Sequence, residues 1–173
     1  LVARRYLAVS RWNVADDWQN TNCIIHGAMS ITGLASVLSG AVGGGIVLTI
    51  WLWVLFWFVI VESVEIWRIG ARTRKYGLAG AIGVYNVTQW SRNFTFGMLY
   101  AFTMFFDLGK TRYGGIPFLM RLHEGVLAAG KWVVLFFLVY EIVLFLRAQS
   151  VFGEFAGRRK RRRGSTRAGG SAL

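Results

Sequence analysis

Hydrophobic residues dominate the first third of the chain. A run of 44 residues, from Trp18 to Val61, contains no Asp, Glu, Lys or Arg. A single helix of that length would be about 66 Å long, roughly twice the thickness of a bilayer's hydrocarbon core. The run must therefore contain a turn, and three successive glycines at 43–45 mark its place. We expect a helical hairpin with spans at 24–42 and 46–61; the alternative is one long, bent helix.

Two further apolar blocks follow this hairpin. Residues 93–106 are apolar up to Asp107, and residues 126–146 form an aliphatic and aromatic block that Arg147 closes. Blocks of this kind predict membrane-spanning helices. The mildly apolar residues 77–91 fit either an interfacial segment or the start of the next span, so the pattern allows three or four spans.

Composition supports the membrane class. Hydrophobic residues make up 55% of the 173 residues and charged residues 16%, against roughly a quarter charged in soluble domains. A lone cysteine, Cys23, excludes a disulfide scaffold. We predict an all-α integral membrane protein, a bundle of helical hairpins with three to four transmembrane helices. Residues 1–23 precede the membrane domain (24–146), and a disordered basic tail (147–173) follows it.

The C-terminal tail carries much of the net charge of +12. Six basic residues are consecutive: Arg158, Arg159, Lys160, Arg161, Arg162 and Arg163. A solvated, flexible end is the simplest interpretation. The sharper alternatives are contact with anionic lipid headgroups, such as those of cardiolipin, or with an acidic partner. Nucleic acid is not expected, because the tail has no interleaved aromatic residues and no folded motif.

The distribution of basic residues predicts orientation. With four spans, the N-terminus, the basic loop at 62–76 and the C-terminal region share one side and hold 15 basic residues, against three on the other side. With three spans the ratio is 12 to six, so four spans give the stronger bias. The N-terminal segment is basic and lacks acids up to Ala15. Such a composition is typical of a matrix-facing N-terminus or of the end of a transit peptide. We therefore expect a multi-pass protein of the mitochondrial inner membrane.

Small residues recur at every fourth position of the first span. The row consists of Ala28, Thr32, Ser36, Gly40 and Gly44. A spacing of four places the row along one helix face. In a bilayer, small faces let two helices approach closely. We predict a helix-packing face, with a partner helix in this chain or in another one.

Four charged residues lie in or beside the last two spans: Arg92, Asp107, Lys131 and Glu141. If these spans are antiparallel neighbours, Arg92 and Glu141 lie at one depth, and Asp107 and Lys131 lie at another. We predict two interhelical ion pairs. Snorkelling of the basic residues to headgroups is the alternative. A proton path through Glu141 would need several polar residues along the same span, which contains one.

The remaining polar residues suggest no catalytic or metal site. His26 and His123 are the only histidines, and with one cysteine they form no recognisable zinc or haem pattern. His123 lies beside Glu124 in what we expect to be a solvated loop. We find no catalytic triad pattern and no phosphate-binding glycine loop. We therefore expect no catalytic residues, no metal and no cofactor other than bound phospholipid.

Two short stretches suggest a family. The first contains Thr21, Cys23, Ala28, Ser30, Thr32 and residues 35–37. The second is Arg92-Asn93-Phe94-Thr95-Phe96-Gly97, followed by Arg112 and the glycines at 125 and 130. Together they resemble, in order, the mitochondrial inner-membrane preprotein translocase family and its relative among the accessory subunits of respiratory complex I. The resemblance covers less than half of the chain. It implies four spans, the mitochondrial inner membrane and a scaffold role in a large complex.

Three classes of function compete. The favoured one is a non-catalytic accessory subunit of a large mitochondrial inner-membrane complex, with complex I or another respiratory complex as host. The membrane region of ATP synthase is an alternative host. A small transporter, channel or translocase component would need a polar lining at the midplane, whereas the polar residues here cluster near span ends. A membrane enzyme would need converging titratable groups. The expected partners are therefore other subunits of a membrane complex and lipids.

Overall fold

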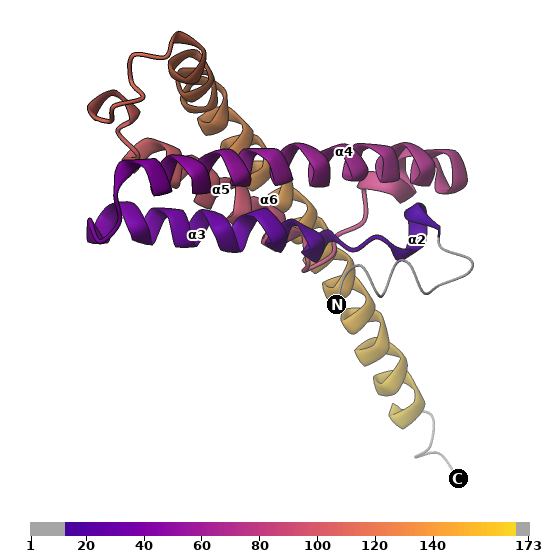
Figure 1. Ribbon diagram of the computed structural model, residues 1–173. Coiled ribbons are helices and arrows are strands. Elements are labelled where there is room, and N and C mark those ends of the chain that lie inside the picture. Colours follow the sequence, from indigo (N-terminus) through magenta and orange to yellow (C-terminus); the bar gives the residue numbers. More distant parts are fainter. Residues whose placement is uncertain (1–12, 169–173) are drawn as a thin grey trace.

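The computed structural model describes the backbone of residues 13–168 and the side chains as far as Ser150. Every regular element in this part is helical (Figure 1). In chain order they are α2 (Val14–Asp17), η1 (Asn20–Cys23), α3 (Ile24–Ser39), α4 (Gly44–Ile82), α5 (Gln89–Phe105), η2 (Leu108–Lys110) and α6 (Pro117–Ala168). The predicted all-helical class is confirmed.

Three described segments are long and apolar enough to cross a membrane: Asn20–Ser39, Gly44–Ile82 and Pro117–Ser150. These agree with a multi-pass membrane protein. Helix α5 has 17 residues, or about 26 Å of helix, and it lies antiparallel to its neighbours in sequence. By length and composition the described residues therefore contain three candidate spans, and α5 is shorter and more polar than these segments.

Helices α3 and α4 lie side by side and antiparallel (Figure 1). The turn between them begins at Gly40, whose φ of 62° lies in the left-handed region. Glycine adopts this conformation without a steric penalty. Its amide donates to the carbonyl of Val37 at 3.2 Å and so closes α3. The hairpin is present, but the turn precedes the predicted glycine triplet, because Gly44 and Gly45 already belong to α4.

Helix α4 continues well beyond its predicted span. Residues 62–76, expected as a basic loop, are helical, and a break comes only at Gly77, with φ 73° and ψ 168°. The loop prediction is corrected for a physical reason: this segment contains no proline, and Glu65 pairs with Arg68 one turn later at 3.0 Å. The helix before the break is about 50 Å long and so exceeds the hydrocarbon thickness.

Helix α6 is also longer than predicted. It starts at Pro117, a residue favoured in the first turn, and continues to Ala168. The backbone of the tail from Arg147 is helical to Ala168, where the sequence predicts a disordered segment; residues 169–173 lie outside the described residues. No proline follows Pro117, and Ala, Arg and Lys favour helix. The side chains of the basic run at 158–163 lie outside the described residues. In Figure 1, α6 crosses the α3–α4 pair obliquely and projects beyond it.

Helix α5 occupies the centre of the bundle, packed against α3 on one side and against α6 on another. Two glycines of α3 make its contact with α5 close. A Cβ added at Gly27 would lie 2.2 Å from Cγ2 of Thr95, and one at Gly33 would lie 2.3 Å from Cε1 of Phe102. Only glycine permits this separation between the two helices.

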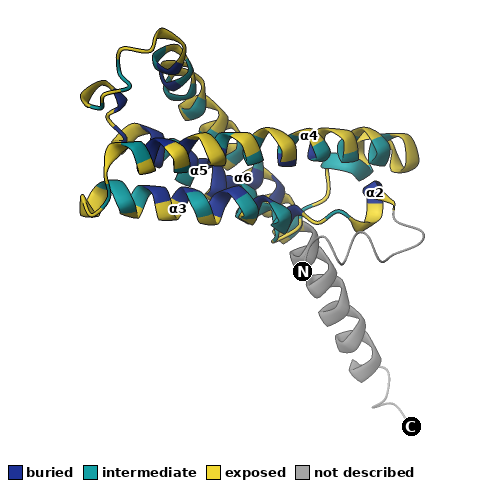
Figure 2. Ribbon diagram, viewed as in Figure 1, coloured by how far each residue is buried: buried dark blue, intermediate teal, exposed yellow. Residues whose placement is uncertain are grey.

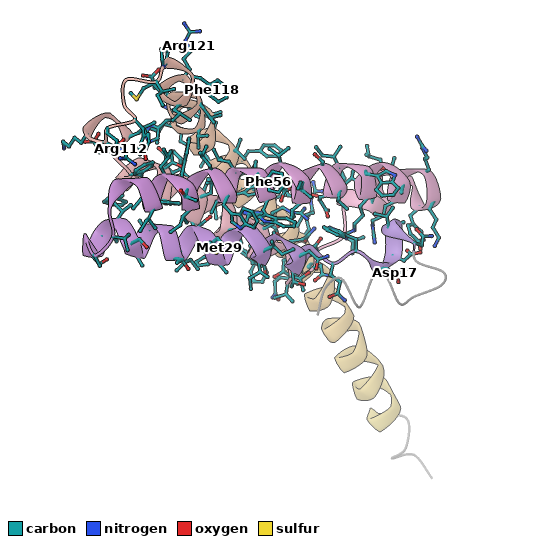
Figure 3. The ribbon with its side chains drawn as sticks, viewed as in Figure 1. Asp17, Met29, Phe56, Arg112, Phe118 and Arg121 are labelled. Carbon is teal, nitrogen blue, oxygen red and sulfur yellow. The ribbon has the colours of Figure 1, made fainter. Side chains whose placement is uncertain are left out.

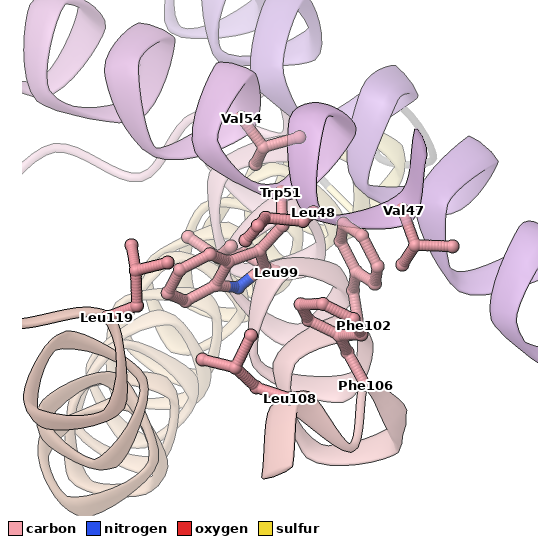
Figure 4. Packing of buried hydrophobic residues seen from close by; sticks show 9 residues of the cluster. All are labelled: Val47, Leu48, Trp51, Val54, Leu99, Phe102, Phe106, Leu108 and Leu119. Carbon is pink, nitrogen blue, oxygen red and sulfur yellow. The ribbon is translucent and has the colours of Figure 1, made fainter. Parts of the chain in front are cut away.

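The hydrophobic core lies at the end of the bundle that contains the α3–α4 turn. It comprises Val47, Leu48, Trp51, Val54, Leu99, Phe102, Phe106, Leu108 and Leu119 (Figure 4). Trp51 and Phe102 are fully buried. The indole of Trp51 donates to the hydroxyl of Thr103 at 2.9 Å. Burial is confined to the interior, and the outer helix faces are largely exposed (Figure 2).

Candidate functional site: a buried ionic cluster

Ionisable side chains from four helices meet near the other end of the bundle, close to η1. They are His26 of α3, Glu62, Glu65 and Arg68 of α4, Arg92 of α5 and Glu141 of α6. The up-and-down path of the chain explains why side chains from four helices converge here. The beginnings of α3 and α5 lie level with later turns of α4 and α6, which run in the opposite direction. We call this group the ionic cluster.

The carboxylate of Glu65 is the centre of the ionic cluster. Its Oε2 lies 2.9 Å from Nη2 of Arg92 and 3.0 Å from Nη1 of Arg68. Nη1 of Arg68 also donates to Oδ1 of Asn20 at 2.5 Å, and the amide of Asn20 donates to the hydroxyl of Thr88 at 3.1 Å. The side chain of Glu65 is 6% exposed, and both arginines are 12% exposed. Two guanidinium groups thus neutralise one buried carboxylate and link α4 to α5 and η1.

Glu62 connects the cluster to α3. Its carboxylate lies 3.8 Å from Nε of Arg92 and 3.7 Å from Nε2 of His26. His26 is fully buried and packs against the rings of Phe58 and Phe96, which also contact each other. Neither of its ring nitrogens makes a hydrogen bond to a described residue. The histidine is therefore held by aromatic packing and by the electrostatic field of Glu62.

Glu141 supplies the third carboxylate. It is 3% exposed, and its Oε2 has no hydrogen-bond partner among the described residues. The neighbouring Tyr140 donates from its hydroxyl to the carbonyl of Ile82 and so ties α6 to the end of α4. The charge of Arg92 acts on Glu141, but the two are not within ion-pair distance.

The two predicted interhelical ion pairs are corrected. Arg92 pairs with Glu65 and Glu62 of α4 instead of Glu141. Asp107 pairs with Lys110, at 2.8 Å on the exposed α5–α6 connection. Lys131 lies over the ring of the adjacent Trp132, 5.6 Å from its centroid. Residues at equal depth in the last hairpin form a pair only if their side chains face each other. Here the helical continuation of α4 brings two acids, Glu62 and Glu65, against Arg92 instead.

The predicted small-residue row faces away from the chain's own helices. Ala28, Thr32 and Gly40 are exposed, and Ser36 is partly buried. The hydroxyl of Thr32 donates to the carbonyl of Ala28 within the helix, at 3.1 Å. At the end of the row, Gly44 contacts Thr111 of the α5–α6 connection, with Cγ2 of Thr111 3.1 Å from the position of an added Cβ.

A different small-residue face makes the contact within the chain. Gly27, Ser30 and Gly33 follow a spacing of three, are buried and face α5. The hydroxyl of Ser30 donates to the carbonyl of His26. This row is as visible in the sequence as the predicted one, but its members are three residues apart instead of four.

His123 also differs from its expectation. It lies in α6, is 8% exposed, and its Nε2 is 3.0 Å from the carbonyl of Thr103 and 2.9 Å from that of Phe106. The last carbonyls of a helix lack partners within that helix. His123 therefore serves as a cap for the C-terminus of α5, and the predicted solvated loop pair is corrected.

The described side chains contain no group of three or more His, Cys, Asp or Glu residues arranged to hold a metal ion. Comparison with protein-family models, with curated proteins and with solved structures finds no match for this chain.

Proposed function

We propose that the chain is a non-catalytic structural subunit of a larger membrane protein assembly. The observation that carries this proposal is the outward small-residue face of α3. Ala28, Thr32 and Ala35 are exposed on a helix whose opposite face is already packed against α5. In lipid, small faces favour close contact with another helix, because no hydrophobic driving force acts between helices there.

The surface of α6 supports the same proposal. Large apolar side chains project from it in several directions, with Trp132 and Phe136 each 64% exposed and Val139 52% exposed. Its apolar segment is far more exposed than that of α3 or α4. Such a helix suits a position among lipids and neighbouring subunits better than a position in a self-contained bundle.

The interior favours a structural role over transport. A translocation path needs polar groups or a water-filled cavity across the bilayer. Here the ionic cluster occupies one end of the bundle. The other end holds the apolar core around Trp51 and Phe102 (Figure 4). The buried charges therefore connect helices to one another, and we assign them a role as a clamp.

The proposed host complex and the proposed membrane compartment are argued from the sequence alone. The basic N-terminal segment and the partial resemblance to inner-membrane translocases and a complex I accessory subunit support the mitochondrial inner membrane and a respiratory complex as host. The membrane region of ATP synthase is the alternative host. Partners in this proposal are other membrane subunits and phospholipids such as cardiolipin.

Native separation after gentle detergent extraction tests the proposal. The full chain should migrate in a particle many times its own mass of 19.5 kDa, together with the same set of subunits in independent preparations. Mass spectrometry of that particle would identify the host. Migration as a single chain or a small homo-oligomer, from membranes in which known complexes stay intact, would contradict the proposal.

A further inference from the structure

An apolar groove lies between α4 and α6, with α5 beneath it. Its volume is about 320 Å³. Leu55 and Phe58 line it from α4, and Phe96 and Leu99 line it from α5. On α6 the lining extends from Arg121 to Val134, or about 20 Å along the helix axis. We propose that this groove binds one acyl chain of an anionic phospholipid whose phosphate is held by Arg121.

The shape of the groove favours an acyl chain over a protein helix. The groove is long and narrow, and its length is comparable to half of the ~30 Å hydrocarbon core. These dimensions fit a lipid chain that enters from one leaflet and ends near the midplane.

Small residues on α6 give the groove its depth. A Cβ added at Gly125 would meet open space, and Ala129 also lines the groove. Gly130 lies deeper, where an added Cβ would be 2.8 Å from the ring of Tyr100. Larger side chains at 125 and 129 would fill the space between α4 and α6.

Charge selects the headgroup. Arg121 is the one charged residue in an otherwise apolar lining. It lies near the start of α6, at the outer end of the bundle (Figure 3). Lys110 at this end is neutralised by Asp107, and Arg112 lies over the ring of Tyr113. Among the described side chains, no carboxylate is within ion-pair distance of Arg121. A guanidinium group binds the phosphate of any phospholipid with two parallel hydrogen bonds. Its positive charge favours a headgroup that is negatively charged overall.

This binding site is independent of the proposed subunit role, since a lipid would bind whether or not the chain joins an assembly. It also differs from the lipid contact predicted for the basic tail, because Arg121 precedes the apolar part of α6 and residues 158–163 follow it. Arg121 lies at the end of the bundle that contains the α3–α4 turn (Figure 3), so the bound lipid belongs to the leaflet on that side.

Photo-crosslinking in bilayers tests the inference. The full chain is reconstituted in phosphatidylcholine vesicles with a trace of phosphatidylglycerol that carries a diazirine at one acyl end. Labelled residues are then mapped by mass spectrometry. We expect labels on α5 near Phe96 and on α6 between Gly125 and Val134, and an excess of unlabelled phosphatidylglycerol should remove them.

Two pairs of variants test separately whether the groove binds the acyl chain and whether Arg121 binds the headgroup. Gly125→Leu should abolish this labelling by filling the groove, whereas Ala128→Leu, at an exposed position of α6 that does not line the groove, should retain it. Arg121→Gln should lower labelling by phosphatidylglycerol about fivefold, the effect of one basic residue at a membrane surface. Arg112→Gln should not.

Three results would overturn the inference. The first is labelling that persists in Gly125→Leu. The second is labelling of the unmodified chain by a phosphatidylcholine probe with the same diazirine that equals the labelling by phosphatidylglycerol. The third is labelling that an excess of unlabelled phosphatidylglycerol does not remove. Thermal unfolding of each variant identifies a loss of labelling that comes from misfolding. If a variant misfolds, competition by unlabelled phosphatidylglycerol in the unmodified protein shows whether the labelling reflects specific binding.

Discussion

At the scale of single residues, Arg92 is the most consequential side chain. It is the one residue of α5 that reaches both acids of α4, at 2.9 Å from Glu65 and 3.8 Å from Glu62. The sequence identifies it as unusual, since a charge beside a span is costly and needs a partner. It does not identify the partner. Depth can be counted along antiparallel helices, but which neighbouring helix a side chain faces depends on how the helices are rotated and packed.

Removing both partners of this buried pair should cost less than the sum of the costs of removing each one alone. Arg92→Leu leaves Glu65 buried and less neutralised, and we expect the free energy of unfolding to fall by about 3–5 kcal/mol. The double variant Arg92→Leu with Glu65→Leu should lose less than the sum of the two single changes. Thermal unfolding in detergent measures all four proteins. Lys110→Gln, which breaks an exposed pair, is the control and should show no measurable change.

Strict additivity of the two single changes would contradict this account. It would mean that the 2.9 Å contact between Arg92 and Glu65 contributes nothing to the folded state. A larger loss in the double variant than in either single variant would not by itself contradict it, because Arg68 also contacts Glu65.

A second residue-scale contact involves Asp16 of α2, which lies outside the candidate membrane-spanning segments and joins the end of α4. Its carboxylate lies 2.6 Å from Nζ of Lys75 and accepts from the hydroxyl of Tyr76 at 2.9 Å. The hydrogen bond from Lys75 and then that from Tyr76 hold the pKa of Asp16 below its ordinary range. The contact therefore persists above the ordinary carboxyl pKa of about 3.9. It is lost as the pH falls through the lowered value.

Carbon-13 NMR of the Asp16 carboxyl group measures this shift directly. We expect its titration midpoint to lie below that of an unperturbed aspartate, and to rise in Lys75→Gln. An unchanged midpoint in that variant would show that Lys75 does not hold the carboxylate in solution.

At the scale of elements, the contact between α3 and α5 sets the bundle geometry. Apolar periodicity predicts that both helices exist; it places the start of α3 correctly at residue 24 and its end three residues too late, at 42 instead of Ser39. It does not predict their closeness, which depends on Gly27 and Gly33 meeting Thr95 and Phe102. The ends of α4 and α6 are missed for a related reason. Charged residues stop a hydropathy pattern, but they do not stop a helix.

Gly33→Ala tests the close contact. The new methyl group would lie 2.3 Å from the ring of Phe102, and we expect a destabilisation of about 1–3 kcal/mol from overpacking. Gly70→Ala is the matched control, because an added Cβ there meets open space and alanine favours helix. Phe102→Leu should partly restore the Gly33→Ala protein. Equal unfolding temperatures for the two alanine variants would contradict a close approach of α3 and α5.

At the scale of the whole molecule, the sequence predicts the class of helical membrane protein but little of the ionic cluster. The 44-residue uncharged run and the later apolar blocks suffice to predict a helical membrane protein. The ionic cluster joins residues up to 115 positions apart, from His26 to Glu141, and no local pattern relates them. What the folded chain leaves uncovered, chiefly α6 and the outward face of α3 (Figure 2), is the basis for placing it among other subunits.

The most direct test of that placement is the native particle size of a variant on the outward face of α3. Thr32→Trp adds a large side chain where a partner helix would approach and leaves the face toward α5 unchanged. The account predicts that Thr32→Trp folds and inserts but leaves the large particle, whereas Ile66→Trp, at a site 71% exposed on α4, remains in it. Retention of Thr32→Trp in a particle of unchanged size and composition would contradict the claim that this face binds another subunit.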